Sequence, residues 1–215
     1  MTAPTILLSG LALVSAALYF RARYRGPQAQ VHLFKPLTTA LILSVALLAP
    51  DPPAALYKWL VVAGLVFSLA GDVFLMLSGD YFVAGWAAFL IAHLVYIAAF
   101  VSDGGPYWSI WPLLAGLAYG LATLRYLWPH LGRMKAPAAL YMLVIVLMAW
   151  QAAGRIPQGS GLSAWLAFGG AVLFVASDSI MTVYRFAKPS ASAPFIYMSA
   201  YYLAQWLIAM SVVAG

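Results

Sequence analysis

The 215-residue sequence predicts an all-α fold, a polytopic bundle of eight transmembrane helices that forms one integral membrane domain over residues 1–215. Two observations lead to this fold class. Hydrophobic residues make up 65% of the chain, and charged residues make up only 7%. The apolar residues also form segments about as long as the roughly 20 residues that a helix needs to cross a hydrocarbon core of about 30 Å.

The first helix is expected over residues 4–20. Its basic residues follow the apolar stretch, whereas a signal peptide carries them in front, so the segment should remain as a helix. The second helix, over 34–49, has the shortest apolar stretch and could begin as early as His32. Because proline suits a first helical turn, Lys35 and Pro36 are expected to open it, forming an anion receptor at the helix N-terminus. The simpler alternative is a lysine that only snorkels to the interface. Residues 21–33 would then be a basic loop.

Six further segments bounded by proline, glycine and charged residues complete the bundle. Aromatic residues lie near many of their ends, as in membrane-interface belts. In the fifth segment, Gly116 and Gly120 form a small-xxx-small packing motif. These six helices are expected over residues 56–78, 81–101, 107–128, 136–153, 161–184 and 194–213.

The basic residues orient the bundle. When loops are assigned alternately to the two sides, the positive-inside rule makes the side with most of the lysines and arginines cytoplasmic. Eight helices then put both termini on the non-cytoplasmic side, and a bacterial inner membrane is the expected location. Only Lys58 and Arg155 lie on the non-cytoplasmic side. The cytoplasmic basic residues are Arg21, Arg23, Arg25, Lys35, Arg125, Arg133, Lys135, Arg185 and Lys188.

The composition excludes several kinds of site. The chain has no cysteine, asparagine or glutamate, which removes disulfides, thiolate metal sites and N-glycosylation sequons. The net charge of +6 comes from dispersed basic residues and indicates no nucleic-acid partner. Only His93 among the histidines lies inside a predicted helix, which is a weak basis for a metal site. We therefore expect no metal and no cofactor.

Asp72 and Asp178 are the acidic residues inside otherwise apolar helices. An ionisable side chain near the bilayer centre costs about 2.5–3.5 kcal/mol on insertion scales, so such residues indicate a functional site. Both are expected roughly 9–10 Å below the cytoplasmic boundary, at ~1.5 Å per helical residue. Their surroundings also match, because Gly64 precedes Asp72 as Gly170 precedes Asp178. This faint repeat predicts two parallel four-helix halves whose interface holds both carboxylates.

Two other helices carry polar side chains on one face. His93 and Tyr96 lie three residues apart, and His93 is expected ~18 Å from the start of its helix, near the bilayer midplane. Tyr197, Tyr201 and Gln205 recur at every fourth residue of the last helix and so share a face. These residues either line a pocket or form a hydrogen-bonded seam between helices.

Two carboxyl groups in a dry pocket can act as an acid and a base. Burial disfavours the charged form and the two carboxylates repel each other, so one is expected to be protonated and the other ionised near neutral pH. Such a pair suits hydrolysis through an oxocarbenium-like intermediate, in which the acid protonates the substrate and the base directs water onto the cation. A serine nucleophile is not expected, because the chain has no Gly-x-Ser-x-Gly motif.

The same residues resemble the YhhN family of membrane proteins, which includes the lysoplasmalogenases. The resemblance covers nearly the whole chain and rests on the order and spacing of several short pieces. They are Lys35-Pro36-Leu37, the segment from Gly64 to Asp72 with Phe67 and Leu69, Gly85 with Phe89, His93 and Tyr96, the segment from Gly170 and Ala171 to Phe174 with Ser177 and Asp178, and Tyr202 with Ala204 and Gln205.

This resemblance implies a membrane hydrolase that cleaves the vinyl ether bond of a lysoplasmalogen, a lysophospholipid with an ether-linked chain, within the lipid bilayer and without a metal or cofactor. The products would be a fatty aldehyde and glycerophosphoethanolamine or glycerophosphocholine. Asp72 and Asp178 become the catalytic acid and base, in either order, and Lys35 would hold the phosphate. The other implied substrate-binding residues are His93, Tyr96, Tyr197, Tyr201 and Gln205, with Phe67, Phe89 and Phe174 beside the alkenyl chain.

Other functions would use the same residues differently. A small proton- or cation-coupled transporter would bind or relay a cation through the two aspartates. A lipid-binding scaffold would need neither carboxylate for chemistry. In the simplest structural interpretation, Asp72 and Asp178 only bond to tyrosine, serine or Arg185 and hold the helices together.

Overall fold

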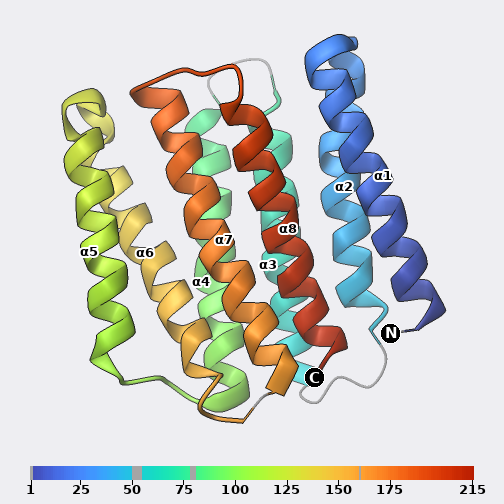
Figure 1. The fold of residues 1–215 in the computed structure, drawn as a ribbon, viewed down its shortest axis with the longest axis vertical. Helices are drawn as coiled ribbons and strands as arrows, with labels where there is room; N and C mark the ends of the chain where they lie inside the picture. Colours follow the sequence, from blue (N-terminus) through green and yellow to red (C-terminus); the bar gives the residue numbers. More distant parts are fainter. Residues whose placement is uncertain (1, 50–54, 78–80, 160) are drawn as a thin grey trace.

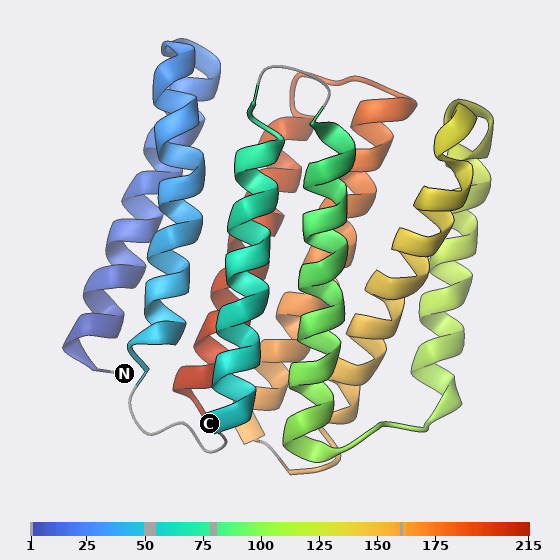
Figure 2. The same cartoon turned by 180° about the vertical axis from the view of Figure 1, so that it is seen from behind.

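The computed structural model describes residues 2–49, 55–77, 81–159 and 161–215, which form a bundle of long α-helices (Figures 1 and 2). Within these residues, eight helices are long and apolar enough to cross a membrane. Two 3₁₀ turns, η1 (Trp128–His130) and η2 (Gly132–Met134), join α5 to α6. The helices are α1 (Ala3–Arg25), α2 (Gln28–Leu47), α3 (Ala55–Phe74), α4 (Phe82–Gly104), α5 (Ile110–Leu127), α6 (Lys135–Gly154), α7 (Gly161–Phe186) and α8 (Ala193–Val213).

The predicted set of eight helices is confirmed, but the predicted basic loop at 21–33 is wrong. Helix α1 runs to Arg25 and α2 begins at Gln28, so only Gly26 and Pro27 separate them. Arginine is a good helix former, and its long side chain reaches the interface while its backbone stays helical. The basic residues therefore extend α1 instead of ending it.

The predicted start of the second helix is also wrong. Pro36 lies inside α2, about two turns after its first residue, and the anion receptor expected at a helix N-terminus beside Lys35 does not form there. Membrane helices tolerate an internal proline because neighbouring groups satisfy the freed backbone carbonyl. The longer α2 instead places Lys35 and Thr39 one turn apart on the same face. The third helix, expected to run to residue 78, ends earlier, at Phe74. Residue 78 itself lies outside the described residues.

The chain is built from two consecutive four-helix halves, α1–α4 and α5–α8. Asp178 follows Asp72 by 106 residues, and the same offset, within one residue, separates the starts of α5, α6 and α7 from those of α1, α2 and α3. The packing repeats as well. Helix α3 packs on α4 as α7 packs on α8, and α4 lies against α6 as α8 lies against α2. This arrangement is that of a parallel repeat related by an axis along the helices.

Glycines set the close approach within each half. A methyl group on Gly64 would overlap the ring of Tyr96 on α4. At the equivalent position, a Cβ on Gly170 would lie 2.8 Å from the carbonyl oxygen of Ala204 on α8. The residue match around the two aspartates therefore has a structural cause, since each aspartate-bearing helix must approach the next one at the same place.

A buried ion pair joins helices at the end of the bundle that holds both termini (Figure 1). Arg155 is 1% exposed, and its guanidinium donates to Asp103 at 2.6 Å and to the Tyr57 hydroxyl at 2.8 Å. From the sequence alone, Arg155 is only a basic residue on the non-cytoplasmic side. In the fold it links α3, α4 and the start of α7, where its other partner Ser163 lies.

Candidate active site

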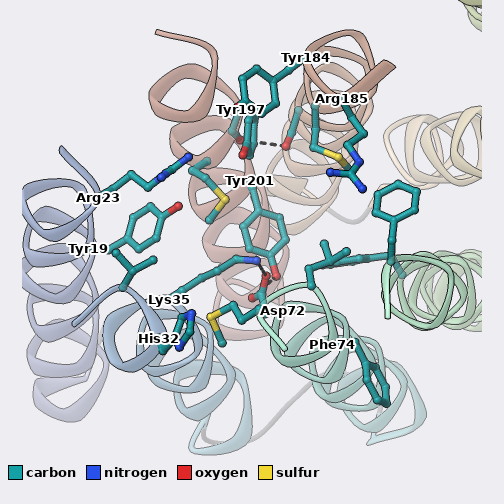
Figure 3. Close-up of a pocket in the computed structure, with 18 of the residues that line it drawn as sticks. Tyr19, Arg23, His32, Lys35, Asp72, Phe74, Tyr184, Arg185, Tyr197 and Tyr201 are labelled. Carbon is teal, nitrogen blue, oxygen red and sulfur yellow. Dashed lines mark hydrogen bonds and ion pairs between the residues drawn. The ribbon is translucent and has the colours of Figure 1, made fainter. Parts of the chain in front are cut away.

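A cavity of about 430 Å³ opens at the opposite end of the bundle, where α1, α3 and α7 finish (Figure 3). We call it the central cavity. Its walls come from both halves of the chain, and both Asp72 and Asp178 line it. The other lining residues are Tyr19, Arg23, Gln28, Val31, His32, Lys35, Phe74, Leu75, Met76, Leu77, Phe82, Phe89, Ser177, Met181, Tyr184, Arg185, Tyr197, Met198 and Tyr201.

Asp72 receives three donors from two neighbouring helices. The Lys35 ammonium lies 3.1 Å from Oδ1, and the Thr39 hydroxyl donates to Oδ2 at 2.6 Å. The Tyr201 hydroxyl, from α8, donates to the same Oδ2 at 2.8 Å (Figure 3). Asp72 is 1% exposed. Its charge is therefore balanced by a cation and by two neutral hydrogen bonds, as a buried carboxylate requires.

Asp178 has a different set of partners. The Tyr141 hydroxyl on α6 donates to its Oδ2 at 2.5 Å, and Nε2 of His93 on α4 lies 3.9 Å from the same oxygen. The Trp86 ring stacks on Tyr141, with ring centroids 5.1 Å apart. Within the described residues, neither nitrogen of His93 has a hydrogen-bond partner. Asp178 thus lies among aromatic side chains, without a lysine or arginine partner among the described residues.

Aromatic rings surround both carboxyl groups. Tyr201 meets Phe89 and Phe174 edge to face, at centroid distances of 5.8 and 5.5 Å. His93 also meets Phe174 edge to face at 4.7 Å. Such rings keep water away from the inner wall and strengthen electrostatic interactions inside the cavity.

The two aspartates lie at different distances from the ends of their helices. Asp72 lies in the last turn of α3, two residues before Phe74, whereas Asp178 lies eight residues before Phe186. The sequence interpretation assumed nearly equal distances. Helix α7 continues about two turns beyond Asp178, so it forms one wall above the carboxyl group and carries Arg185 to the cavity mouth.

The other expected site residues fall into two groups. Lys35, Tyr197 and Tyr201 line the central cavity with the aspartates. His93, Tyr96 and Gln205 are fully buried and are not among the described residues that line it.

Within this second group, His93 approaches Asp178 from behind. Tyr96 instead donates to the Gln205 Oε1 at 2.8 Å, in a seam between α4 and α8. Both interpretations of these polar helix faces therefore apply, to different residues. Some of the side chains line the pocket, and others form a hydrogen-bonded seam between helices.

Sequence reasoning did not select Tyr141, the nearest partner of Asp178. A tyrosine in an apolar helix gives no signal of its own, because most such residues only pack. The offset of 106 residues would have found it, since that offset places Tyr141 on Lys35. Phe67, expected beside a substrate chain, is 37% exposed and is not among the described lining residues, whereas Phe89 lines the cavity.

Among the described residues, no group of three or more histidine, aspartate or glutamate side chains could hold a metal ion. What the central cavity offers is a pair of carboxyl groups with different partners, set in an aromatic wall beneath a basic mouth.

Comparison with known proteins places the chain in a family. Residues 30–212 match the model of the YhhN family. The chain belongs to the YhhN family. It is 33% identical over 198 residues to the uncharacterized membrane protein YhhN of Escherichia coli O6:H1, a match that covers 88% of this chain and 92% of that protein.

Mammalian enzymes are similar as well. Lysoplasmalogenase TMEM86B of Homo sapiens is 36% identical over 160 residues, covering 74% of this chain and 66% of the enzyme. Lysoplasmalogenase TMEM86A of Bos taurus is 34% identical over 160 residues, covering 71% of this chain and 65% of the enzyme. No solved structure matches the chain. All of α1, with Tyr19 and Arg23, precedes the part that matches the YhhN model.

Proposed function

We propose that this protein is a membrane-embedded hydrolase that cleaves the vinyl ether bond of a lysoplasmalogen. The products are a fatty aldehyde and glycerophosphoethanolamine or glycerophosphocholine. Similarity to two lysoplasmalogenases supports the reaction class. The observation that carries the proposal is the presence of two buried carboxyl groups, Asp72 and Asp178, on one aromatic-walled cavity.

The chemistry needs only an acid, a base and one water molecule. A proton added to the alkenyl carbon beta to the ether oxygen produces an oxocarbenium ion. Water adds to this cation and loses a proton, and the resulting hemiacetal collapses to an aldehyde and an alcohol. Asp72 and Asp178 supply the acid and the base in this scheme. The buried surroundings strengthen their interaction with the developing charge.

The phosphate of the substrate is placed at the cavity mouth. Lys35, the residue first expected to hold it, is already paired with Asp72. Arg23 on α1 and Arg185 on α7 line the mouth from opposite sides (Figure 3). Within the described residues, neither arginine forms an ion pair with a carboxylate. Guanidinium groups bind phosphate through paired hydrogen bonds, so this pair replaces Lys35 as the phosphate site.

This placement also orients the lipid. With its phosphate at the mouth, the vinyl ether bond lies deeper, beside Asp72 and Asp178, and the chain extends along the apolar wall that includes Phe89. His93, Tyr96 and Gln205 support the wall from behind, while Tyr197 and Tyr201 face the substrate. By the positive-inside rule, the mouth is cytoplasmic and the termini are outside, in a bacterial inner membrane.

The test is aldehyde release by the purified protein in detergent. Wild type should release aldehyde from a lysoplasmalogen, and Asp72→Asn and Asp178→Asn should each lose nearly all turnover while eluting and melting as folded protein. Tyr24→Phe, which changes an exposed residue outside the cavity lining, is the matched control and should keep full activity. Full activity in either asparagine variant would refute the dyad.

A coupled transporter is the second candidate, and the two-half architecture favours it, because many transporters bind their cargo between repeats. Helices α3 and α7 nevertheless run unbroken through Asp72 and Asp178, unlike the interrupted helices of many carriers. A transporter would move protons or cations across liposomes in a substrate-dependent way and release no aldehyde, whereas the hydrolase releases aldehyde without ion flux.

A further inference from the structure

The two carboxyl groups occupy equivalent positions in the two halves, but their partners differ in charge. Lys35 on α2 contacts Asp72, and Tyr141 on α6 contacts Asp178. Each partner precedes its aspartate by 37 residues. The repeat therefore supplies two copies of one carboxyl site, one with a lysine and one with a tyrosine at the same place.

The second contact of each aspartate also follows the repeat. Asp72 is reached from α8 by the Tyr201 hydroxyl, and Asp178 is reached from α4 by the His93 ring. Helices α8 and α4 are equivalent members of the two halves. The contacts of the two aspartates thus come from equivalent helices and differ in the chemistry of the side chains.

The partners of Asp72 favour its ionised form. Both of its oxygens accept, one from the Lys35 ammonium and the other from the hydroxyls of Thr39 and Tyr201. A proton on this carboxyl group would displace one of these donors and would leave the lysine without its anion. Removal of one partner from a buried ion pair is strongly unfavourable.

The surroundings of Asp178 favour its protonated, neutral form. Among the described residues, no lysine or arginine lies within ion-pair distance of its carboxyl group, and the Tyr141 hydroxyl is a neutral donor. The His93 ring is completely buried and neither of its nitrogens has a hydrogen-bond partner among the described residues, which favours its uncharged form. The lysine and arginine residues of the cavity lining are Arg23, Lys35, which pairs with Asp72, and Arg185, whose guanidinium lies 4.9 Å from the Phe82 ring centre. A buried carboxyl group without a cation is more stable with its proton.

We propose that Lys35 and Tyr141 divide the duplicated dyad into an ionised Asp72 and a protonated Asp178, so that Asp178 is the general acid and Asp72 the general base. The catalytic meaning of this division rests on the proposed hydrolase function, but the division itself does not. Lys35 and Tyr141 act as positioning residues that set the charge of their aspartates and do not touch the bond that breaks.

The cycle closes with this assignment. Asp178 gives its proton to the alkenyl carbon, and Asp72 takes a proton from the water that adds to the oxocarbenium ion. In the collapse of the hemiacetal, Asp72 returns that proton to the leaving glycerol oxygen as the carbon–oxygen bond breaks. Asp178 removes the proton of the hemiacetal hydroxyl as the aldehyde forms. Both groups then regain their starting states.

Carbon-13 NMR of aspartate-labelled protein in detergent tests the division directly, because a carboxyl carbon shifts between its protonated and ionised forms. The chain has five aspartates and no glutamate, so few signals are expected. Asp72→Asn and Asp178→Asn assign the two signals by their loss. At neutral pH, the Asp178 signal should lie at the protonated position and the Asp72 signal at the ionised position. The reverse order, or two ionised signals, would overturn the proposal.

A swap of the two partners provides the second test. In Tyr141→Lys, the Asp178 signal should move to the ionised position, and kcat should fall by roughly 100-fold or more, as for loss of a general acid, with little change in KM. If this variant does not fold, Lys35→Tyr gives the converse reading, in which the Asp72 signal moves to the protonated position. Signals that stay in place in a folded swap variant would refute the role of the partners.

The NMR outcome is independent of turnover. A protein with the expected signals and no aldehyde release keeps the charge division and loses the hydrolase proposal. A protein that releases aldehyde with the signals reversed keeps the hydrolase and loses the assignment of acid and base.

Discussion

At the scale of single residues, the site depends on how each buried carboxyl group is satisfied. Asp72 is held by a cation and two hydroxyl donors, whereas Asp178 is held by one hydroxyl group among aromatic rings. A bilayer protein retains such groups only where they have partners. The consequences of removing a partner can therefore be predicted residue by residue.

Lys35→Met should destabilise the protein, because it leaves the Asp72 charge buried without a cation. We expect the free energy of unfolding to fall by about 3 kcal/mol, near the lower end for one partner of a buried pair. The double variant Lys35→Met with Asp72→Asn should recover most of this loss, since it removes the orphaned charge. Denaturant unfolding in detergent measures the coupling, and strictly additive effects would argue against the ion pair.

Arg23→Gln and Arg185→Gln should weaken substrate binding without slowing the chemical step. Each loses charge-assisted hydrogen bonds to the phosphate, so we expect KM to rise roughly tenfold while kcat stays close to the wild-type value. Arg133→Gln, which removes an exposed arginine outside the cavity lining, is the control. Unchanged KM in both cavity variants would exclude the arginines as the phosphate site.

At the scale of helices, close packing of α3 on α4 and of α7 on α8 positions the two aspartates. Adjacent glycines on α7 allow a matched test. Gly170→Ala would bring a methyl group against the backbone of α8, 2.8 Å from the Ala204 carbonyl oxygen, whereas a methyl group on Gly169 has only Leu207 at 3.7 Å.

We therefore expect Gly170→Ala to lower the free energy of unfolding by about 1–3 kcal/mol, as overpacking does. Gly169→Ala should leave stability unchanged or slightly raised, because alanine favours a helix over glycine by about 1 kcal/mol. Thermal unfolding in detergent compares the two. Equal effects would show that Gly170 does not set the approach of α7 to α8.

The number and order of the helices can be predicted from the sequence, because apolar length is a strong signal. The ends of the helices and the side-chain partners across helices cannot be predicted in this way. The arginines after Phe20 continue α1, and Pro36 sits inside α2, since in a bundle neither basic residues nor one proline must end a helix. Asp72 and Asp178 were identifiable from charge in an apolar segment. Tyr141 was not, because its role exists only where α6 meets α7.

The same difference explains the interpretation of Lys35. From the sequence, a lysine before a proline resembles the start of a helix, and an anion receptor follows from that position. In the fold, the earlier start of α2 turns Lys35 toward α3, where it pairs with Asp72. Which anion a buried lysine meets is a property of helix packing that a linear pattern does not contain.

At the scale of the whole molecule, the chain is a duplicated four-helix unit with its cavity at one end and its termini at the other (Figures 1 and 2). The positive-inside rule predicts that the cavity end is cytoplasmic. Because the chain has no cysteine, single introduced cysteines report the orientation cleanly.

We predict that Ser190→Cys, between α7 and α8 at the cavity end, is protected from a membrane-impermeant maleimide in intact bacterial cells. Gln158→Cys, between α6 and α7 at the other end, should be labelled. Both residues are exposed in the structure. The reverse labelling pattern would invert the proposed orientation and place the cavity mouth outside.

The central claim is that buried carboxyl groups protonate a vinyl ether carbon, and the aldehyde formed in heavy water tests it most directly. If Asp178 and Asp72 act as proposed, wild-type protein in deuterium oxide releases aldehyde with one deuteron on the carbon next to the carbonyl group, and Asp178→Asn releases almost none. Mass spectrometry of the product measures both. Aldehyde without that deuteron, or undiminished release by Asp178→Asn, would contradict the claim.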